Sequence, residues 1–182
     1  MNLPKTFKPS SRSPAKIELR WLHEWLCENK GKYNESKKVL EFGCGVTSWV
    51  LNNSLKPEVH VVMEAFEPCI QSTLHHIPSI QVVRTTWGDI PKINYDIIFV
   101  DASTHPPKGL KPMILRAKHR VFRDDVVKYV EDFQADNALI ILHDWNYKEG
   151  YKAPRRYVES KGYPLVASLK THYGFGIYQV KK

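Results

Sequence analysis

Two acidic residues, Asp101 and Asp144, each close a short run of apolar residues, and Asn146 follows the second of them. Two carboxylates and an amide oxygen suit a hard divalent cation such as Mg²⁺. A cation held there would lower the pKa of a bound hydroxyl group. Polar strand ends or helix caps are the alternative interpretation, and the sequence leaves both open.

His143 directly precedes Asp144 and could act as a general base. In a regular strand, neighbouring side chains point to opposite faces, so His143 is expected to point away from Asp144. A structural role is therefore an alternative for this histidine. The candidate catalytic residues are Asp101, His143 and Asp144.

A glycine turn, Gly43-Cys44-Gly45, ends another apolar run. Its glycines would let the backbone bend and approach a ligand closely. The dinucleotide-binding fingerprint requires a third glycine at position 48, where this chain has Ser48, so an NAD-dependent enzyme ranks last. Glu64 follows these glycines by about 20 residues along the chain. At this spacing a carboxylate can accept hydrogen bonds from the hydroxyls of a ribose.

Short Val/Ile-rich runs alternate with amphipathic patterns along the chain, which predicts an α/β fold with a parallel sheet and helices on both faces. The predicted strands are 38–42, 59–64, 80–85, 95–102 and 138–144, and the predicted helices are 47–55, 67–77 and 123–134. After residue 150 the pattern predicts a helix at 153–162 and an antiparallel hairpin from 163–170 and 173–181. An earlier helix is expected to start with Ser13 as N-cap and Pro14 as first residue, and to end before Gly31.

Three stretches together resemble class I S-adenosylmethionine-dependent methyltransferases over roughly residues 38 to 144. They are "VLEFGCG", "VVMEAFEP" and "WGDIP...YDIIFVDA". The resemblance implies a Rossmann-like, doubly wound sheet of seven strands with an antiparallel C-terminal hairpin. We expect a single domain at 14–182, with the cofactor half at about 38–102 and the substrate side at about 103–182. Residues 1–13 are expected to form a flexible arm, and Pro4 and Pro9 with few apolar residues fit plain disorder equally.

The resemblance implies S-adenosylmethionine as cofactor and assigns roles to several residues. Glu41 would lie near the methionine amino group, the glycine turn would wrap the cofactor, and Glu64 would hold the ribose. Asp89 follows the third strand and could accept from the adenine amino group, while Trp87 could cover the ring face. A place in the core is an equal alternative for Trp87. The expected cofactor-binding residues are Glu41, Gly43, Cys44, Gly45, Glu64, Ala65, Trp87, Gly88, Asp89 and Asp101.

The segments "FVDA" and "HDWN" are similar to the metal-binding segments of cation-dependent O-methyltransferases. In those enzymes Asp is followed directly by Asn, whereas Trp145 intervenes here. The resemblance therefore supports Asp101 and Asp144 as ligands of Mg²⁺ or another divalent cation, with Asn146 as the third.

A basic segment, 103–123, follows the fourth predicted strand and contains no acidic residue. Because the chain also carries a net charge of +8, an anionic substrate or a nucleic-acid backbone is a possible partner. A solvated basic surface is the alternative. The expected substrate-binding residues are Lys108, Lys111, Arg116 and Tyr147.

The leading hypothesis is a methyltransferase that modifies a hydroxyl of a small or anionic acceptor, such as a sugar or an aromatic, with or without a metal. An RNA methyltransferase and a non-catalytic protein of the same fold are the alternatives.

The three cysteines have no CxxC spacing, which argues against a zinc site or a disulfide framework. No long apolar run or signal peptide is present, so a cytoplasmic protein is expected, with an organelle transit peptide as the alternative.

Overall fold

The computed structural model describes residues 14–32, 37–64, 66–84, 89–101, 130–147 and 153–181 of the chain. The helices are α1 (Lys16–Glu28), α2 (Val46–Leu55), α3 (Glu67–His76) and α6 (Ala153–Ser160). The strands are β1 (Lys38–Phe42), β2 (Val59–Met63), β3 (Gln81–Val83), β4 (Tyr95–Val100), β5 (Gln134–His143), β6 (Leu165–Leu169) and β7 (Phe175–Gln179). Within these residues, no helix has the length and apolar character needed to cross a bilayer.

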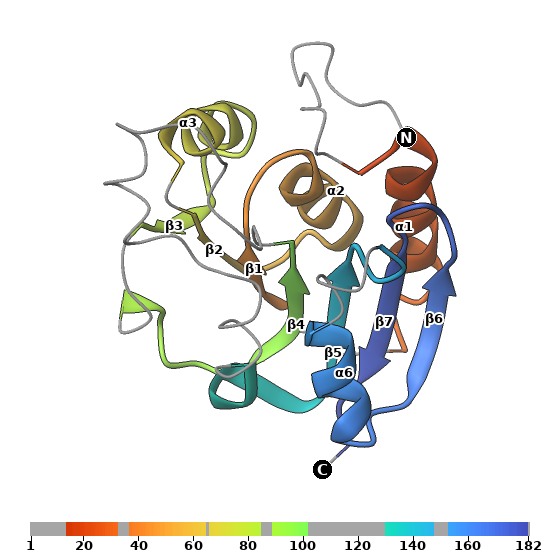
Figure 1. The fold of residues 1–182 in the computed structure, drawn as a ribbon. Helices are drawn as coiled ribbons and strands as arrows, with labels where there is room; N and C mark the ends of the chain where they lie inside the picture. The colour runs from red at the N-terminus through yellow and green to blue at the C-terminus, as the bar shows by residue number, and fades with distance from the viewer. Residues whose placement is uncertain are drawn as a thin grey trace, which may run out of the picture.

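The strands form one seven-stranded sheet in the order β3-β2-β1-β4-β5-β7-β6 (Figure 1). β1 to β5 run parallel to their neighbours, and β7 is antiparallel to both β5 and β6. The predicted doubly wound fold with its antiparallel hairpin is therefore confirmed. The strand order reverses between β1 and β4, and ligands of such sheets bind beyond the carboxyl ends of the strands at this switch point.

Helices cover both faces of the sheet because alternate strand residues are buried on each side. One face packs against α1 and α2. Its buried residues are Leu19, Leu22, Leu26, Val39, Val46, Val50, Leu51, Leu55, Ile97, Phe99, Leu139, Ile141, Phe175 and Ile177. The opposite face packs against α6 and the helical residues 130–133, through a core that includes Leu40, Phe42, Ile98, Ile140, Val158 and Tyr178. Trp21 and Trp25 of α1 pack beside the first core.

Helix α1 begins later than the sequence predicts. Its N-cap is Ala15, not Ser13, and Pro14 precedes the helix. Alanine has no side chain that can cap, but the Glu18 carboxylate accepts the Ala15 backbone N–H at 2.7 Å. The capping function therefore lies three residues further along the chain, on Glu18, while Ser13 is outside the described residues.

Strand β5 begins earlier than the sequence predicts. Gln134 was expected to end a helix, but it pairs with Tyr95 as the first residue of β5. The register then shifts between Tyr95 and Ile97, and Asn137 has a positive φ of 62°. An irregular strand start of this kind breaks the period-2 pattern, which explains why only the apolar part of β5 was predicted.

The loop after β5 packs tightly against β7. A Cβ added at Gly176 would lie 2.3 Å from Cδ1 of Trp145, whose ring is held by a hydrogen bond to the Tyr178 hydroxyl (2.7 Å) and by the Arg155 guanidinium 4.3 Å above it. Gly176→Ala is therefore expected to lower the free energy of unfolding by about 2 to 3 kcal/mol in urea titrations. Gly31→Ala is the matched control, since a Cβ there meets no atom within 4 Å. Equal stability of the two variants would contradict this packing.

Candidate functional site

The glycine turn between β1 and α2 lies at the switch point of the sheet. Gly43 has φ 89° and Gly45 has φ 153°, values that L side chains rarely adopt. The Gly43 N–H donates to the carbonyl of Met63 at the end of β2 (3.0 Å). A Cβ built on Gly45 would meet no atom within 4 Å. The turn is thus fixed by its backbone and faces open space, where a ligand could approach.

Ser48, which stands where a dinucleotide fingerprint would have glycine, has a local role. Its side chain is fully buried, and its hydroxyl accepts the Gly45 N–H at 3.1 Å. A third glycine would leave this N–H without that acceptor. This chain therefore closes the turn with the hydroxyl group of residue 48, where the fingerprint has glycine.

Glu64 directly follows β2 and lies beside the glycine turn. Its carboxylate accepts the Cys44 N–H at 3.4 Å and the Phe66 N–H at 2.8 Å, one on each oxygen. Each carboxylate oxygen has more than one acceptor position, so further hydrogen bonds from two hydroxyl groups are possible. The side chain is half-buried, which leaves it open to a ligand. The position and chemistry of Glu64 fit a ribose.

Glu41 lies beneath the turn and is completely buried. Its carboxylate accepts the Thr47 hydroxyl at 2.9 Å and faces Nε2 of His60 at 3.1 Å. Burial raises the pKa of Glu41, and the interactions with His60 oppose this rise. The carboxylate thus connects β1, β2 and α2, and its expected contact with a methionine amino group stays a prediction.

Cys44 lies in the turn but is not suited to nucleophilic chemistry. Burial and the nearby charges of Glu64 and Glu41 raise the pKa of its thiol well above the usual range. The thiol is therefore protonated at neutral pH, and a thiolate would be needed for attack.

Asp101 and His143 meet at the carboxyl ends of β4 and β5. The two strands pair Val100 with Leu142, so the next residues along are Asp101 and His143. Oδ1 of Asp101 lies 2.7 Å from Nδ1 of His143. The Asp101 N–H also donates to the Phe42 carbonyl at the end of β1 (2.9 Å), which places Asp101 next to the glycine turn.

Regular strand alternation predicts that Asp144 points away from His143, but the structure shows the two side chains close together. Its Oδ1 lies 3.5 Å from Nδ1 of His143. The strand ends at His143, and Asp144 adopts the left-handed backbone conformation with φ 56°, which redirects its side chain. The predicted proximity of Asp101 and Asp144 is found, with His143 between them, and ligand atoms of the three residues lie within 4.8 Å of one another.

Glu18 of α1 belongs to the same cluster, and no motif in the sequence points to it. The side chain is 1% exposed, and Oε2 lies 3.9 Å from Nε2 of His143. The only signal in the sequence is its spacing of three residues from the N-cap, which is also typical of an ordinary capping residue.

The charges in this cluster shift the pKa values of its members strongly. Burial alone would lower the pKa of His143, but the charges of Asp101 and Asp144 and the interactions with Asp101 and Glu18 raise it to about 10. Burial alone would raise the pKa of Glu18, but its hydrogen bonds and its interaction with His143 lower it to about 2. An imidazole that keeps its proton at neutral pH is a poor general base.

An aromatic cluster, Tyr147, His172 and Tyr173, lies beside these charged residues. Ring centroids are 4.9 Å apart for Tyr147 and Tyr173, and 6.1 Å apart for His143 and Tyr173. Asn146 connects the two loops involved, because its amide Nδ2 donates to the Thr171 carbonyl at 2.9 Å. Tyr147 is therefore close to the candidate catalytic residues, and its role as a substrate contact stays a prediction.

Of the remaining predicted site residues, the structure describes only Asp89. Asp89 is exposed at the start of the segment that leads to β4. The other residues of this group lie outside the described ranges: Ala65, Trp87, Gly88, Lys108, Lys111 and Arg116. The adenine side and the basic segment of the site therefore stay predictions.

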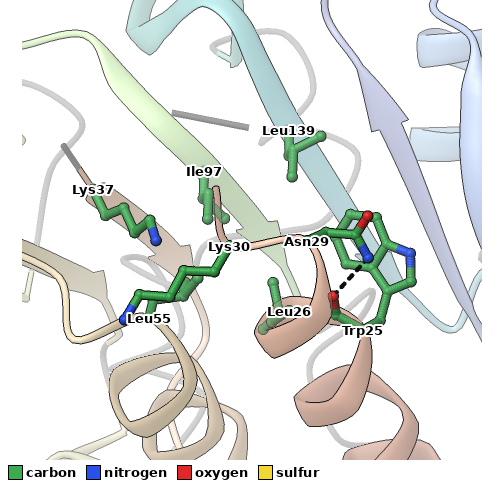
Figure 2. A pocket seen from close by; sticks show the side chains of 8 residues that line it. All are labelled: Trp25, Leu26, Asn29, Lys30, Lys37, Leu55, Ile97 and Leu139. Atoms are coloured by element: carbon green, nitrogen blue, oxygen red, sulfur yellow. Dashed lines mark hydrogen bonds between the residues drawn. The ribbon is translucent and has the colours of Figure 1, made fainter. Parts of the chain in front are cut away.

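A small cavity of about 10 Å³ lies at the other end of β1, away from the glycine turn (Figure 2). It is lined by Trp25, Leu26, Asn29, Lys30, Lys37, Leu55, Ile97 and Leu139. A cavity of this size holds about one water molecule. It lies at the last turn of α1, so it is not part of the candidate site.

Comparison with solved structures identifies the fold. The O-methyltransferase TomG from Streptomyces achromogenes, solved in complex with SAM, superposes with a TM-score of 0.61 at 15% identity, covering 98% of this chain and 93% of that chain. A methyltransferase from Geobacter sulfurreducens gives a TM-score of 0.65 at 13% identity, with 94% and 82% covered. Ribosomal protein L11 methylase from Lactobacillus delbrueckii subsp. bulgaricus gives 0.59 at 10% identity, with 93% and 81% covered.

No protein-family model matches the sequence, and comparison with curated proteins gives no match either. At these low identities the structural likeness shows the fold alone. The chain has the Rossmann-like fold of class I methyltransferases, as the sequence motifs predict.

Proposed function

We propose that the chain is an S-adenosylmethionine-dependent methyltransferase that acts on a hydroxyl group of a small acceptor. One observation carries the proposal: Glu64 lies against the glycine turn at the switch point of a sheet with this strand order. Glu64 provides the carboxylate that a ribose requires, and the bare backbone of the turn allows a ligand to approach closely.

The cofactor would supply a methyl group on a sulfonium, and the chain mainly has to align donor and acceptor. Gly43, Gly45 and Glu64 are the residues proposed to hold the cofactor. Asp101 follows β4 next to the turn, so it is placed to contact both cofactor and acceptor.

A hydroxyl acceptor must also lose its proton. The buried imidazolium of His143 is unsuited to accept it. The side chains of Asp101 and Asp144 are 20% and 12% exposed, so they are the members of the cluster that an acceptor can reach. We assign proton acceptance to this pair of carboxylates and a supporting role to His143.

Calorimetric titration with S-adenosylmethionine and its demethylated product tests the cofactor site. Glu64→Ala is expected to weaken binding by about 10- to 100-fold, because hydrogen bonds to a charged group are lost. Glu58→Ala, at an exposed position just before β2, is the matched control and is expected to bind as the wild type does. Absence of binding by the wild-type chain would refute the methyltransferase proposal.

A divalent cation is a second component that we propose for the same site. The support is the donor set: two carboxylates with reachable oxygens and an imidazole, with ligand atoms within 4.8 Å of one another. Nδ1 of His143 already faces Asp101, so Asp101 and Asp144 would be the ligands, and a contribution of Asn146 stays a prediction. We expect a heat of Mg²⁺ binding that is lost in Asp101→Asn and Asp144→Asn. If the heat persists in both variants, the cation binds elsewhere.

The net charge of +8 also supports RNA as an acceptor. Affinity for RNA that falls steeply with salt would favour this alternative over a small molecule. Cofactor binding without transfer to any acceptor would favour a non-catalytic protein of the same fold.

A further inference from the structure

A side-chain hydrogen bond spans the glycine turn. Glu41 stands two residues before Gly43, and Thr47 stands two residues after Gly45. The Thr47 hydroxyl donates to Oε1 of Glu41 at 2.9 Å, and both side chains are buried. This hydrogen bond, the Glu41–Thr47 clasp, therefore joins β1 to the first turn of α2 across the two glycines.

His60 of β2 holds the other oxygen of the same carboxylate. Glu41 pairs with Val62 in the register of β1 and β2, so His60, two residues before Val62, lies on the same face of the sheet. Nε2 of His60 lies 3.1 Å from Oε2 of Glu41, and the two side chains are 3% and 0% exposed. With Glu41 ionised, Nε2–H is the donor of this hydrogen bond. The carboxylate is thus oriented by β2 and α2 together.

The stability of the fold does not explain a histidine at this position. Nδ1 of His60 is buried and has no hydrogen-bond partner within the part of the chain that the structure describes, and such an atom costs stability. A buried pair of charged groups is often no more stabilising than apolar side chains of the same volume. The arrangement therefore serves more than the core, and the segment that it holds is the glycine turn.

The shape of this turn depends on contacts with its neighbours, because glycine has no side chain to restrict its backbone. The Gly45 N–H donates to the Ser48 hydroxyl at 3.1 Å, in the same first turn of α2 that the clasp fixes. The Cys44 N–H donates to Glu64 at 3.4 Å. A shift of the turn would therefore also displace the carboxylate that is proposed to hold the ribose.

We propose that His60 is a positioning residue for the cofactor: through Glu41 it keeps the clasp closed, and it thereby holds the glycine turn in the shape that receives S-adenosylmethionine. The inference rests on the proposed function, because only a bound cofactor gives the shape of the turn a functional consequence. It is separate from the expected contact of Glu41 with the methionine amino group, since the clasp acts on the backbone of the turn.

Two amide variants test the contact between His60 and Glu41. Glutamine places its amide nitrogen about where Nε2 of histidine lies, whereas asparagine places it about where Nδ1 lies. His60→Gln can therefore still donate to Glu41, and His60→Asn cannot. In the ligand-free proteins, the N–H groups of Gly43 and Gly45 should exchange their hydrogen about 10-fold faster in His60→Asn than in the wild type, and within about threefold of the wild-type rate in His60→Gln.

Gln134→Met is the control for destabilisation alone. Gln134 is a buried polar residue at the first position of β5, at the opposite end of the sheet from the turn. Its replacement should not accelerate exchange at the two glycines selectively. Wild-type exchange rates in folded His60→Asn, or equal acceleration in both amide variants, would overturn the proposal.

If His60→Asn does not fold, Thr47→Val decides, because it opens the clasp from α2 and leaves the contact between His60 and Glu41 in place. Faster exchange at the same two glycines would support the proposal. Unchanged exchange would show that the clasp does not hold the turn, and the proposal would fail.

Calorimetric titration connects the turn to the cofactor. The ligands are S-adenosylhomocysteine and methylthioadenosine, which lacks the amino and carboxyl groups. Both should bind about 10-fold more weakly to His60→Asn than to the wild type, because the proposal places the turn against the part that they share. A loss confined to S-adenosylhomocysteine would mean that Glu41 acts on the amino group and not through the turn, which would overturn the proposal. If the wild type binds neither ligand, the proposed function is refuted, while the exchange rates still decide whether His60 holds the turn.

Discussion

Replacement of His143 by glutamine is expected to lower the free energy of unfolding by about 3 to 5 kcal/mol near neutral pH. The positive charge of the protonated His143 ring faces the carboxylates of Glu18, Asp101 and Asp144. Glutamine preserves much of the side-chain volume but removes the charge, so the carboxylates would repel one another in a poorly solvated site. Urea titration of the two proteins measures the difference.

His75→Gln provides the control for this substitution. His75 is exposed in the last turn of α3, so its replacement should change stability by less than about 0.5 kcal/mol. If His143→Gln were as stable as this control, the charged cluster would not contribute to the fold. A loss of stability together with unchanged cofactor binding would agree with a supporting role for His143.

The architecture was predictable because its signals are local. Each strand from β1 to β4 appears in the sequence as an apolar run, and the glycine turn appears as two glycines after the first of them. Glu64 was predicted from its distance to these glycines, and the structure places its carboxylate beside the Cys44 N–H. Spacing along the chain determines such placements, so they do not depend on the packing of distant segments.

The composition of the charged cluster depends on tertiary structure and was only partly predictable. The register of β4 and β5 determines that His143 lies opposite Asp101, and the sequence does not contain this register. The left-handed conformation of Asp144 reverses the direction expected from alternation. Glu18 enters the cluster because α1 packs against the sheet beside His143. A helix pattern in the sequence does not indicate which strand ends the helix will lie against.

Ser48 and Glu41 show a different limit. The sequence correctly treats Ser48 as a departure from the dinucleotide fingerprint, but only the structure shows that its hydroxyl accepts the Gly45 N–H. The resemblance implies that Glu41 lies near the ligand, which stays a prediction, and the structure adds its contacts with Thr47 and His60 beneath the turn. Family motifs thus locate the turn, and only the structure shows which protein groups its side chains contact.

The stability of the protein is expected to decline as the pH rises from about 6.5 to about 10. In the unfolded chain His143 loses its proton near its ordinary pKa of 6.5, whereas the carboxylates around it raise the pKa to about 10 in the folded chain. The stabilisation is therefore complete below pH 6.5 and is lost as the pH approaches 10, with an upper limit of about 5 kcal/mol. Glu18 acts in the opposite direction: its pKa falls from 4.5 to about 2, so its contribution is complete above pH 4.5 and is lost toward pH 2.

Urea titrations across this pH range on the wild type and on His143→Gln isolate the effect, because every other titrating group is common to both. The difference in the free energy of unfolding should be largest between about pH 4.5 and 6.5, where His143 and Glu18 both contribute in full. It should shrink steadily above pH 6.5 and approach zero near pH 10, where the folded wild type also loses the proton. A difference that stays constant from pH 6.5 to 10 would mean that the loss in His143→Gln comes from packing and not from the charge between the carboxylates.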